Sequence, residues 1–229
     1  MTTPENEAEN PMTRTSPMVD TPETLHREQA ATVCVQLRDA THASHVRINR
    51  HPYLSGLLKA GYPLAQYQTL LAMYAVLYAA IESQVASFIA VNDVPFEYGH
   101  CHKTQWLRED LTHFDINLHE APWQPPALPT LLILADRGAL IGTLYAIEGA
   151  TLGGEVISRH LQDHLQLGPS TGARFFNGYG DALTTRRNWQ TFSGFANSIG
   201  TDKNLQASAV LSAVSIFELI EYQLDALQA

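Results

Sequence analysis

Apolar side chains recur every three to four residues along most of the chain, which is the spacing of one face of an α-helix. The clearest case is the segment 63–90, and similar spacing marks the segments 34–48, 103–114, 184–199 and 202–227. No segment shows the strict alternation of a half-buried strand or the signal of a hairpin turn. The pattern therefore predicts an all-α protein of roughly six to eight helices, packed as a bundle.

One further segment, 138–165, keeps helical spacing without a proline and is predicted to form a single long helix. It contains glycines where a helix tolerates them poorly, since each interior glycine costs a helix roughly 1 kcal/mol relative to alanine. Gly142, Gly149 and Gly153 are spaced by seven and four residues, which places them on one face. Two interpretations remain open. Such a face permits close helix–helix packing, or it lets a flat, bulky ligand approach the backbone at a bend.

Composition narrows the class of protein. The formal net charge of −9 argues against nucleic-acid binding through a basic surface. The longest strongly apolar run, 69–81, is too short to span a bilayer, and no signal-peptide pattern is present. The two cysteines, Cys34 and Cys101, form no disulfide framework. We therefore expect a cytoplasmic protein with neither a nucleic-acid nor a membrane partner.

The organisation of the chain is predicted to be simple. Residues 1–22 are polar and proline-bearing, and are predicted to be a disordered tail. Pro22 suits the first position of a helix. Residues 23–229 are predicted to form one helical domain, because the chain is 45% apolar and shows no internal repeat.

Most of the ten histidines lack a partner at metal-ligand spacing. His160 and His164 are four residues apart, which suits either a metal or a solvated helix face. The Glu-x-x-His form at Glu97 and His100 is typical of di-iron bundles, but it has no second copy. The sequence contains no nucleophile elbow, phosphate loop or dinucleotide fingerprint, so we expect no bound flavin or nicotinamide.

His45 differs from the other histidines in its neighbours. It shares the apolar face of the first helix with Leu37, Thr41 and Ile48. A histidine there is either a core residue or a neutral imidazole ligand to a metal whose other ligands are not protein. Asn49, one helical turn later, is placed to orient the ring.

Several motifs carry a resemblance to a known family. The pattern Leu37-Arg38-x-x-Thr41-x-x-x-His45 resembles the proximal-helix signature of haem oxygenases. The block from Gly142 to Gly154 resembles the distal-helix signature of their bacterial branch, which supplies biliverdin to phytochromes. Further similarity at 106–111 and 174–180, and at Trp189 and Phe192, extends the resemblance over residues 30–227.

The resemblance implies a haem-oxygenase-like helical bundle with haem held between two helices. His45 would be the axial ligand to the haem iron. Gly149 and Gly153 would be the catalytic positions on the other face, where the bare backbone admits dioxygen. Arg38 and Tyr145 would contact a haem propionate. Arg187, with Arg186 as its alternative, would contact the other propionate.

The implied reaction is the oxidative opening of haem to biliverdin, carbon monoxide and ferrous iron, with haem as both substrate and cofactor. Electrons would come from an external ferredoxin or reductase, and a bacteriophytochrome is the expected bilin acceptor. Two positions depart from the family pattern. Ala150 replaces an aspartate or serine, and Asn49 replaces an acid. These departures favour an alternative function, that of a non-catalytic haem carrier or sensor with the same fold.

Overall fold

The computed structural model of the chain describes residues 32–119 and 134–228. The predicted tail at 1–22 and the helix start at Pro22 lie outside these ranges. The described residues form the helices α2 (Val33–Arg50), α3 (Pro52–Gly56), α4 (Leu64–Val91), η2 (Gly99–Cys101), α5 (Lys103–His113), α6 (Arg137–Gly149), η3 (Ala150–Gly153), α7 (Gly154–Leu165), α8 (Arg174–Asn177), α9 (Ala182–Asn197) and α10 (Lys203–Ala226). No strand occurs among them, so the predicted all-α class is confirmed.

The periodic segments of the sequence correspond closely to α2, α4, α5, α9 and α10. The short helices α3 and α8 were not predicted, because one turn of helix is too short to show a repeating apolar pattern. One end of each is marked by a residue with a special backbone conformation. Pro52 is the first residue of α3. The helix α8 ends at Asn177, and the next residue, Gly178, has a φ of 56°.

The prediction of one continuous helix over 138–165 is wrong. The backbone passes from α6 through the short 3-10 segment η3 into α7. The break coincides with residues that stabilise an α-helix poorly, Gly149, Gly153 and Gly154. Within it, the Thr151 hydroxyl donates to the carbonyl oxygen of Glu148 at 2.7 Å, a local bond that competes with regular helical bonding.

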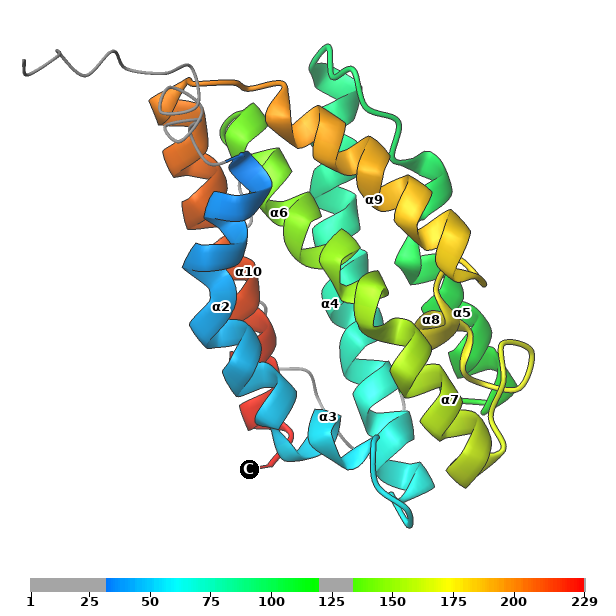
Figure 1. The fold of residues 1–229 in the computed structure, drawn as a ribbon. Helices are drawn as coiled ribbons and strands as arrows, with labels where there is room; N and C mark the ends of the chain where they lie inside the picture. The colour runs from blue at the N-terminus through cyan, green and yellow to red at the C-terminus, as the bar shows by residue number, and fades with distance from the viewer. Residues whose placement is uncertain (1–31, 120–133, 229) are drawn as a thin grey trace, which may run out of the picture. The chain divides into compact units, whose positions relative to one another are not determined.

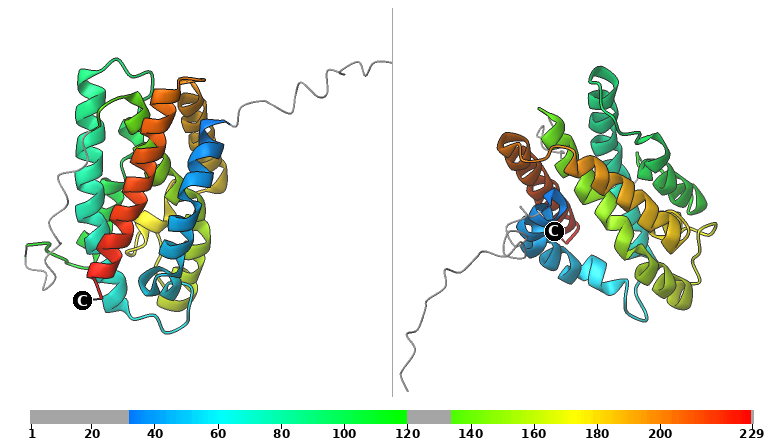
Figure 2. Two further views of the ribbon diagram at one scale, coloured as in Figure 1. Left: turned by 90° about the vertical axis from the view of Figure 1, so that its left-hand side faces the viewer. Right: turned by 45° about the horizontal axis from the view of Figure 1, so that its top comes forward.

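The helix α4 supplies many core side chains, and its buried residues cover most of the circumference of its middle turns. Figures 1 and 2 show α2 beside α10, and α10 also packs against α6. In the view of Figure 1, α4 lies behind α6 and α7. Arg47 joins α2 to α10 through a bidentate ion pair with Glu221, at 2.6 and 2.8 Å.

Two glycines of α6 lie at its contact with α10. A Cβ placed on Gly142 would overlap the carbonyl oxygen of Ala209, and one on Gly138 would overlap that of Leu205. These two glycines therefore let the backbones of α6 and α10 approach closely. For Gly142, the packing interpretation of the glycine face is correct.

Two helices, α4 and α10, are long and apolar enough to cross a membrane when judged on length and composition alone. Both supply side chains to the core, among them Tyr67 and Leu71 from α4, and Ile216 and Leu224 from α10. Their apolar character is thus accounted for by packing within the bundle.

Candidate functional site

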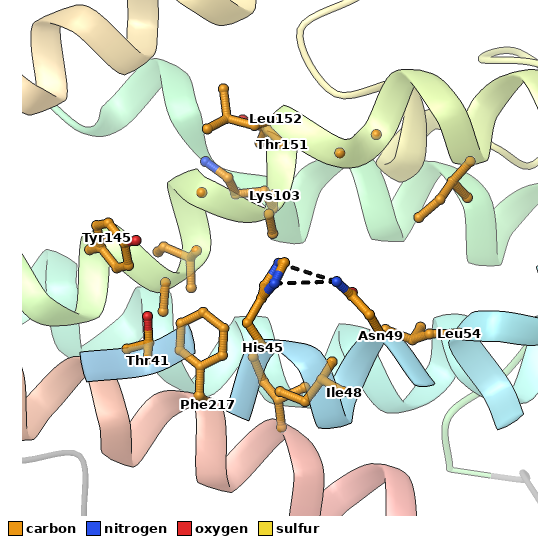
Figure 3. Close-up of a pocket in the computed structure, with 18 of the residues that line it drawn as sticks. Thr41, His45, Ile48, Asn49, Leu54, Lys103, Tyr145, Thr151, Leu152 and Phe217 are labelled. Carbon is orange, nitrogen blue, oxygen red and sulfur yellow. Dashed lines mark hydrogen bonds between the residues drawn. The ribbon is translucent and has the colours of Figure 1, made fainter. Parts of the chain in front are cut away.

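A cavity of about 840 Å³ lies between α2 and the stretch formed by α6, η3 and α7 (Figure 3). Every described α-helix contributes to its wall. The lining is mostly apolar and rich in aromatic rings, namely Tyr74, Tyr78, Trp106, Tyr145, Phe175, Phe176, Trp189 and Phe217. Cavities that enclose organic ligands usually measure about 300–1,000 Å³, so this one has the size and character for a large, flat, mainly apolar molecule.

His45 projects from α2 into this cavity, toward the side where Thr151 and Leu152 lie (Figure 3). Its ring packs edge-on against Phe217 of α10, with 6.0 Å between the ring centroids. The side-chain amide of Asn49 lies 3.3 Å from His45 Nδ1 and 3.4 Å from Nε2. The ring therefore contacts one side chain of α10 and one of its own helix.

The environment of His45 favours the neutral imidazole. Partial burial lowers the pKa of His45 below its ordinary value, and the neighbouring His42 lowers it further. A neutral imidazole has a free ring nitrogen, which is the form that binds a metal ion. His45 therefore lines the cavity, and its role as an axial ligand stays a prediction.

Gly149 and Gly153 lie in the opposite wall of the cavity. A Cβ on Gly149 would meet only Trp189, at 3.8 Å, and one on Gly153 would meet nothing within 4 Å. In contrast to Gly142, these two glycines are not needed for contact between helices. The glycine face predicted from the sequence therefore has two parts: Gly142 serves packing, while Gly149 and Gly153 leave bare backbone facing the cavity.

Ala150 and Thr151 complete this wall. Ala150 brings no polar side chain to it, and the Thr151 hydroxyl is engaged with the backbone of Glu148. The polar groups closest to a ligand here are those of the backbone. Ala150 and Thr151 therefore contribute peptide groups to this part of the wall, and neither contributes an acidic side chain.

Arg38 and Tyr145 both line the cavity. Arg38 is exposed on α2 and pairs with Asp39 through Nε and Nη2, at 3.0 and 2.9 Å. Tyr145 is half-buried on α6 beside Trp189, and burial raises the pKa of its hydroxyl, so the hydroxyl is protonated at neutral pH. A guanidinium and a phenol thus stand where a carboxylate of a bound ligand could be received.

The structure does not bring Arg187 into the cavity wall. This residue is exposed on α9, the helix that contributes Trp189 to the wall. Arg186 lines a separate, smaller pocket of about 320 Å³ on the other side of Thr151 and Leu152. His42, three residues before His45 on α2, is also exposed and lines the cavity.

Sequence reasoning missed a buried polar cluster behind the glycine wall. Lys103 is 1% exposed and contributes to the cavity wall, and its ammonium group pairs with Glu148, which is 2% exposed. The Tyr179 hydroxyl donates to the other carboxylate oxygen of Glu148 at 2.9 Å. One signal could have revealed the cluster: Glu148 is the single charged residue between Arg137 and Glu155, and a charge inside an apolar helix requires a buried partner.

The other histidine motifs do not form a metal site in the part of the chain that the structure describes. Neither His160 nor His164 lines the cavity, and their ring centroids are 5.6 Å apart. Glu97 is exposed in the loop before η2. Within 32–119 and 134–228, no group of three or more histidine, cysteine or acidic side chains could hold a metal ion.

Comparisons with known proteins agree on one family. The family model described as "Heme oxygenase" matches residues 31–224. A comparison with curated protein sequences gives no match.

Solved structures share the fold at low sequence identity. A haem oxygenase-2 from Synechocystis, solved with haem and NO, is 21% identical, with a TM-score of 0.74 over 86% of each chain. A haem oxygenase from Neisseria meningitidis is 19% identical, with a TM-score of 0.67 over 87% of this chain and 94% of its own. The haem oxygenase from Leptospira interrogans is 15% identical, with a TM-score of 0.67 over 84% of this chain and 98% of its own. At these identities the likeness establishes the helical fold.

Proposed function

Since this chain belongs to the haem oxygenase family and is an enzyme of that type, we propose that it opens haem to biliverdin, carbon monoxide and ferrous iron. The reaction consumes dioxygen and reducing equivalents. Haem is at once the substrate and the group that supplies the redox chemistry. No bound flavin or nicotinamide takes part.

One observation carries the proposal. A neutral histidine, His45, faces a cavity whose opposite wall has no side chains at Gly149 and Gly153. The residues present fit haem, because a flat apolar ring needs an apolar slot, its iron needs a nitrogen ligand, and bound dioxygen needs space on the far side.

We assign a separate role in haem binding to each of the residues that line the cavity. His45 binds the iron from α2, and Asn49 orients the imidazole. Because the amide is neutral, it raises the basicity of His45 less than a carboxylate would. Gly149 and Gly153 would leave bare backbone facing a bound haem, so that space and peptide groups would be available to dioxygen. The surrounding aromatic rings exclude bulk water.

The propionates are received by polar groups near the cavity. Arg38 exchanges its contact with Asp39 for a propionate, and the Tyr145 hydroxyl donates a second hydrogen bond. Arg187 of α9 stays the proposed contact for the second propionate, although its side chain lies outside the cavity wall in this structure. Together these contacts fix the rotation of the ring, and thereby which meso carbon faces dioxygen.

Electrons come from an external ferredoxin or reductase. We place the enzyme in the cytoplasm, where a bacteriophytochrome is the proposed acceptor of the bilin. Neither nucleic acid nor a membrane is a partner in this scheme.

The test is a single-turnover experiment. Haemin added to the protein should give a Soret band, and a reductant with air should replace that band with biliverdin absorption. A stable Soret band under these conditions would instead favour the alternative, a haem carrier or sensor. Ala150 and Asn49, which depart from the family pattern, are the features that make this alternative worth testing.

A further inference from the structure

The lysine and glutamate behind the glycine wall form a fully buried ion pair. Lys103 Nζ contacts Glu148 Oε1, donates to the carbonyl oxygen of Cys101 at 2.9 Å and approaches the Tyr179 hydroxyl to 3.3 Å. Its ammonium group also lies 5.2–5.6 Å from the ring centroids of Tyr98, Trp106 and Tyr179. Every donor and acceptor of the pair is thus close to a partner.

A buried ion pair is an unusual way to fill space in a core. Removing two charges from water is costly, and a well-packed apolar pair of similar volume is often at least as stable. Ion pairs are directional, however, whereas apolar contacts are not. The segments that carry Lys103 and Glu148 therefore indicate which part of the backbone the ion pair orients.

The lysine side of the pair is anchored to the core. Glu82 of α4 accepts from the backbone N–H of Lys103 at 2.6 Å and from that of Thr104 at 3.0 Å. It also accepts from the Tyr98 hydroxyl at 2.8 Å. The first turn of α5, and with it the stem of Lys103, is held on α4, the central helix of the core.

The glutamate side of the pair ends at the cavity. Glu148 is the residue before Gly149, where α6 passes into η3. On the cavity side nothing packs within 3.8 Å of a Cβ at Gly149, or within 4 Å of one at Gly153. At the far end of the break, Gly154 is fixed by close approach to the carbonyl oxygen of Phe176. Between these points, side-chain packing does little to hold the backbone over the cavity.

We infer that Lys103 and Glu148 are positioning residues that fix the segment from Gly149 to Gly153 at a set height above the cavity. Only one consequence of this inference rests on the proposed function, namely that the position of the segment sets the space above a bound haem. The ion pair ties one end of the bare segment to α4 and α5, and Gly154 ties the other end to α8.

The first test uses the haem-free protein and amide hydrogen exchange. Lys103→Met leaves the Glu148 carboxylate buried without its cation, so exchange at residues 149–154 should speed up at least tenfold relative to exchange in α9. Lys103→Arg keeps the charge and should restore slow exchange. Slow exchange that persists in Lys103→Met would overturn the inference.

A double variant separates positioning from mere stability. Lys103→Met with Glu148→Met replaces the ion pair by an apolar pair and should recover much of the melting temperature. Exchange at 149–154 should remain fast. If this variant recovers both properties, the pair serves packing alone and the inference fails. It also provides a folded protein if Lys103→Met does not fold.

Gly142→Ala is the matched control on the same helix. It strains the contact between α6 and α10 without touching the ion pair. It should lower the melting temperature and leave the ratio of exchange at 149–154 to exchange in α9 unchanged. A rise of that ratio in the control would show that any loss of stability loosens the segment, and would also overturn the inference.

The haem-bound protein gives an independent readout. With haem and carbon monoxide bound, Lys103→Met and the double variant should both change the carbon monoxide dissociation rate, whereas Lys103→Arg should not. Failure of the wild type to bind haem would count against the proposed function, and the exchange experiment would still decide on the ion pair.

Discussion

Asn49 and His45 form a side-chain pair on the cavity side of α2, with 3.3 Å between Asn49 Nδ2 and His45 Nδ1 (Figure 3). The amide is neutral, so it can orient the imidazole without stabilising its charged form. Partial burial and His42 both lower the pKa of His45, and no carboxylate beside it opposes them.

The first prediction concerns this pair. Asn49→Asp places a negative charge beside the imidazole and should raise the pKa of His45 by about one unit. An NMR titration of the haem-free protein measures the shift. Asn49→Leu is the control and should not raise the pKa. Equal pKa values in the two variants would show that residue 49 does not interact with the ring.

The second prediction concerns the iron ligand. His45→Ala should fold normally, because its side chain faces the cavity, and it should lose the spectrum of histidine-bound haem. His42→Ala should keep that spectrum, because His42 lies three residues before His45 and its side chain leaves α2 about one turn earlier. Absorption and resonance Raman spectra of the two haem complexes make the comparison. The opposite pattern would move the ligand to His42.

The third prediction concerns the two kinds of glycine. Gly149→Ala and Gly153→Ala should leave the stability of the haem-free protein equal or raise it by up to about 1 kcal/mol, because the added methyl group meets little protein. Both should slow biliverdin formation, because the methyl group occupies space over the ring. Melting curves and single-turnover rates measure the two effects.

Gly142→Ala supplies the contrast for that experiment. Its methyl group would overlap the carbonyl oxygen of Ala209, so this variant should lose about 1–3 kcal/mol of stability. Its residual activity should follow the folded fraction. If the variants at 149 and 153 behaved in the same way, these glycines would be packing residues too.

The fourth prediction concerns the propionate contacts. Arg38→Gln and Tyr145→Phe should each weaken haem binding severalfold and yield mixed biliverdin isomers, since each removes one donor to a carboxylate. Haemin titration and chromatography of the bilin products measure these effects. Arg159→Gln is the control, because Arg159 is exposed on α7 and pairs only with Glu155 among the described residues. An unchanged isomer ratio in both site variants would remove them from the propionate site.

The fifth prediction is a pH dependence that arises at Asp110. This buried carboxyl accepts the backbone N–H groups of Arg174 and Phe175 at 2.6 and 2.8 Å, and so anchors α8. Burial outweighs these bonds and raises the pKa of Asp110 to about 6, from an ordinary value of 3.8. A raised pKa means that the stabilising contribution is fully present below pH 3.8 and is lost as pH rises through 6.

The measurement is urea unfolding of the wild type and Asp110→Asn between pH 4 and 7.5. The free energy of unfolding of the wild type, minus that of the variant, should fall by roughly 2–3 kcal/mol over this range. Other titrating groups cancel in the difference. A difference that stays constant with pH would mean that Asp110 titrates near its ordinary pKa.

Much of this protein's secondary structure could be predicted from local sequence patterns. The helical period predicted α2, α4, α5, α9 and α10, because apolar residues recur every three to four positions along each of these helices. The position of His45 on the first helix, and the absence of side chains at Gly149 and Gly153, are properties of the sequence alone. They were sufficient to predict that these three residues line one cavity.

Tertiary structure decided what local patterns leave open. Gly142 and Gly149 are equivalent in the sequence, and only the approach of Ala209 on α10 gives the first a packing role and leaves the second free. Likewise, Lys103 and Glu148 lie 45 residues apart and meet only because the fold brings the start of α5 close to the end of α6. Helical period depends on neighbours one turn away, whereas the partner of a glycine face or a buried charge comes from a distant segment. The sequence by itself therefore determined the helices and the residues that line the cavity, and only the packed bundle decided which glycines lie at a helix contact and which buried charges pair.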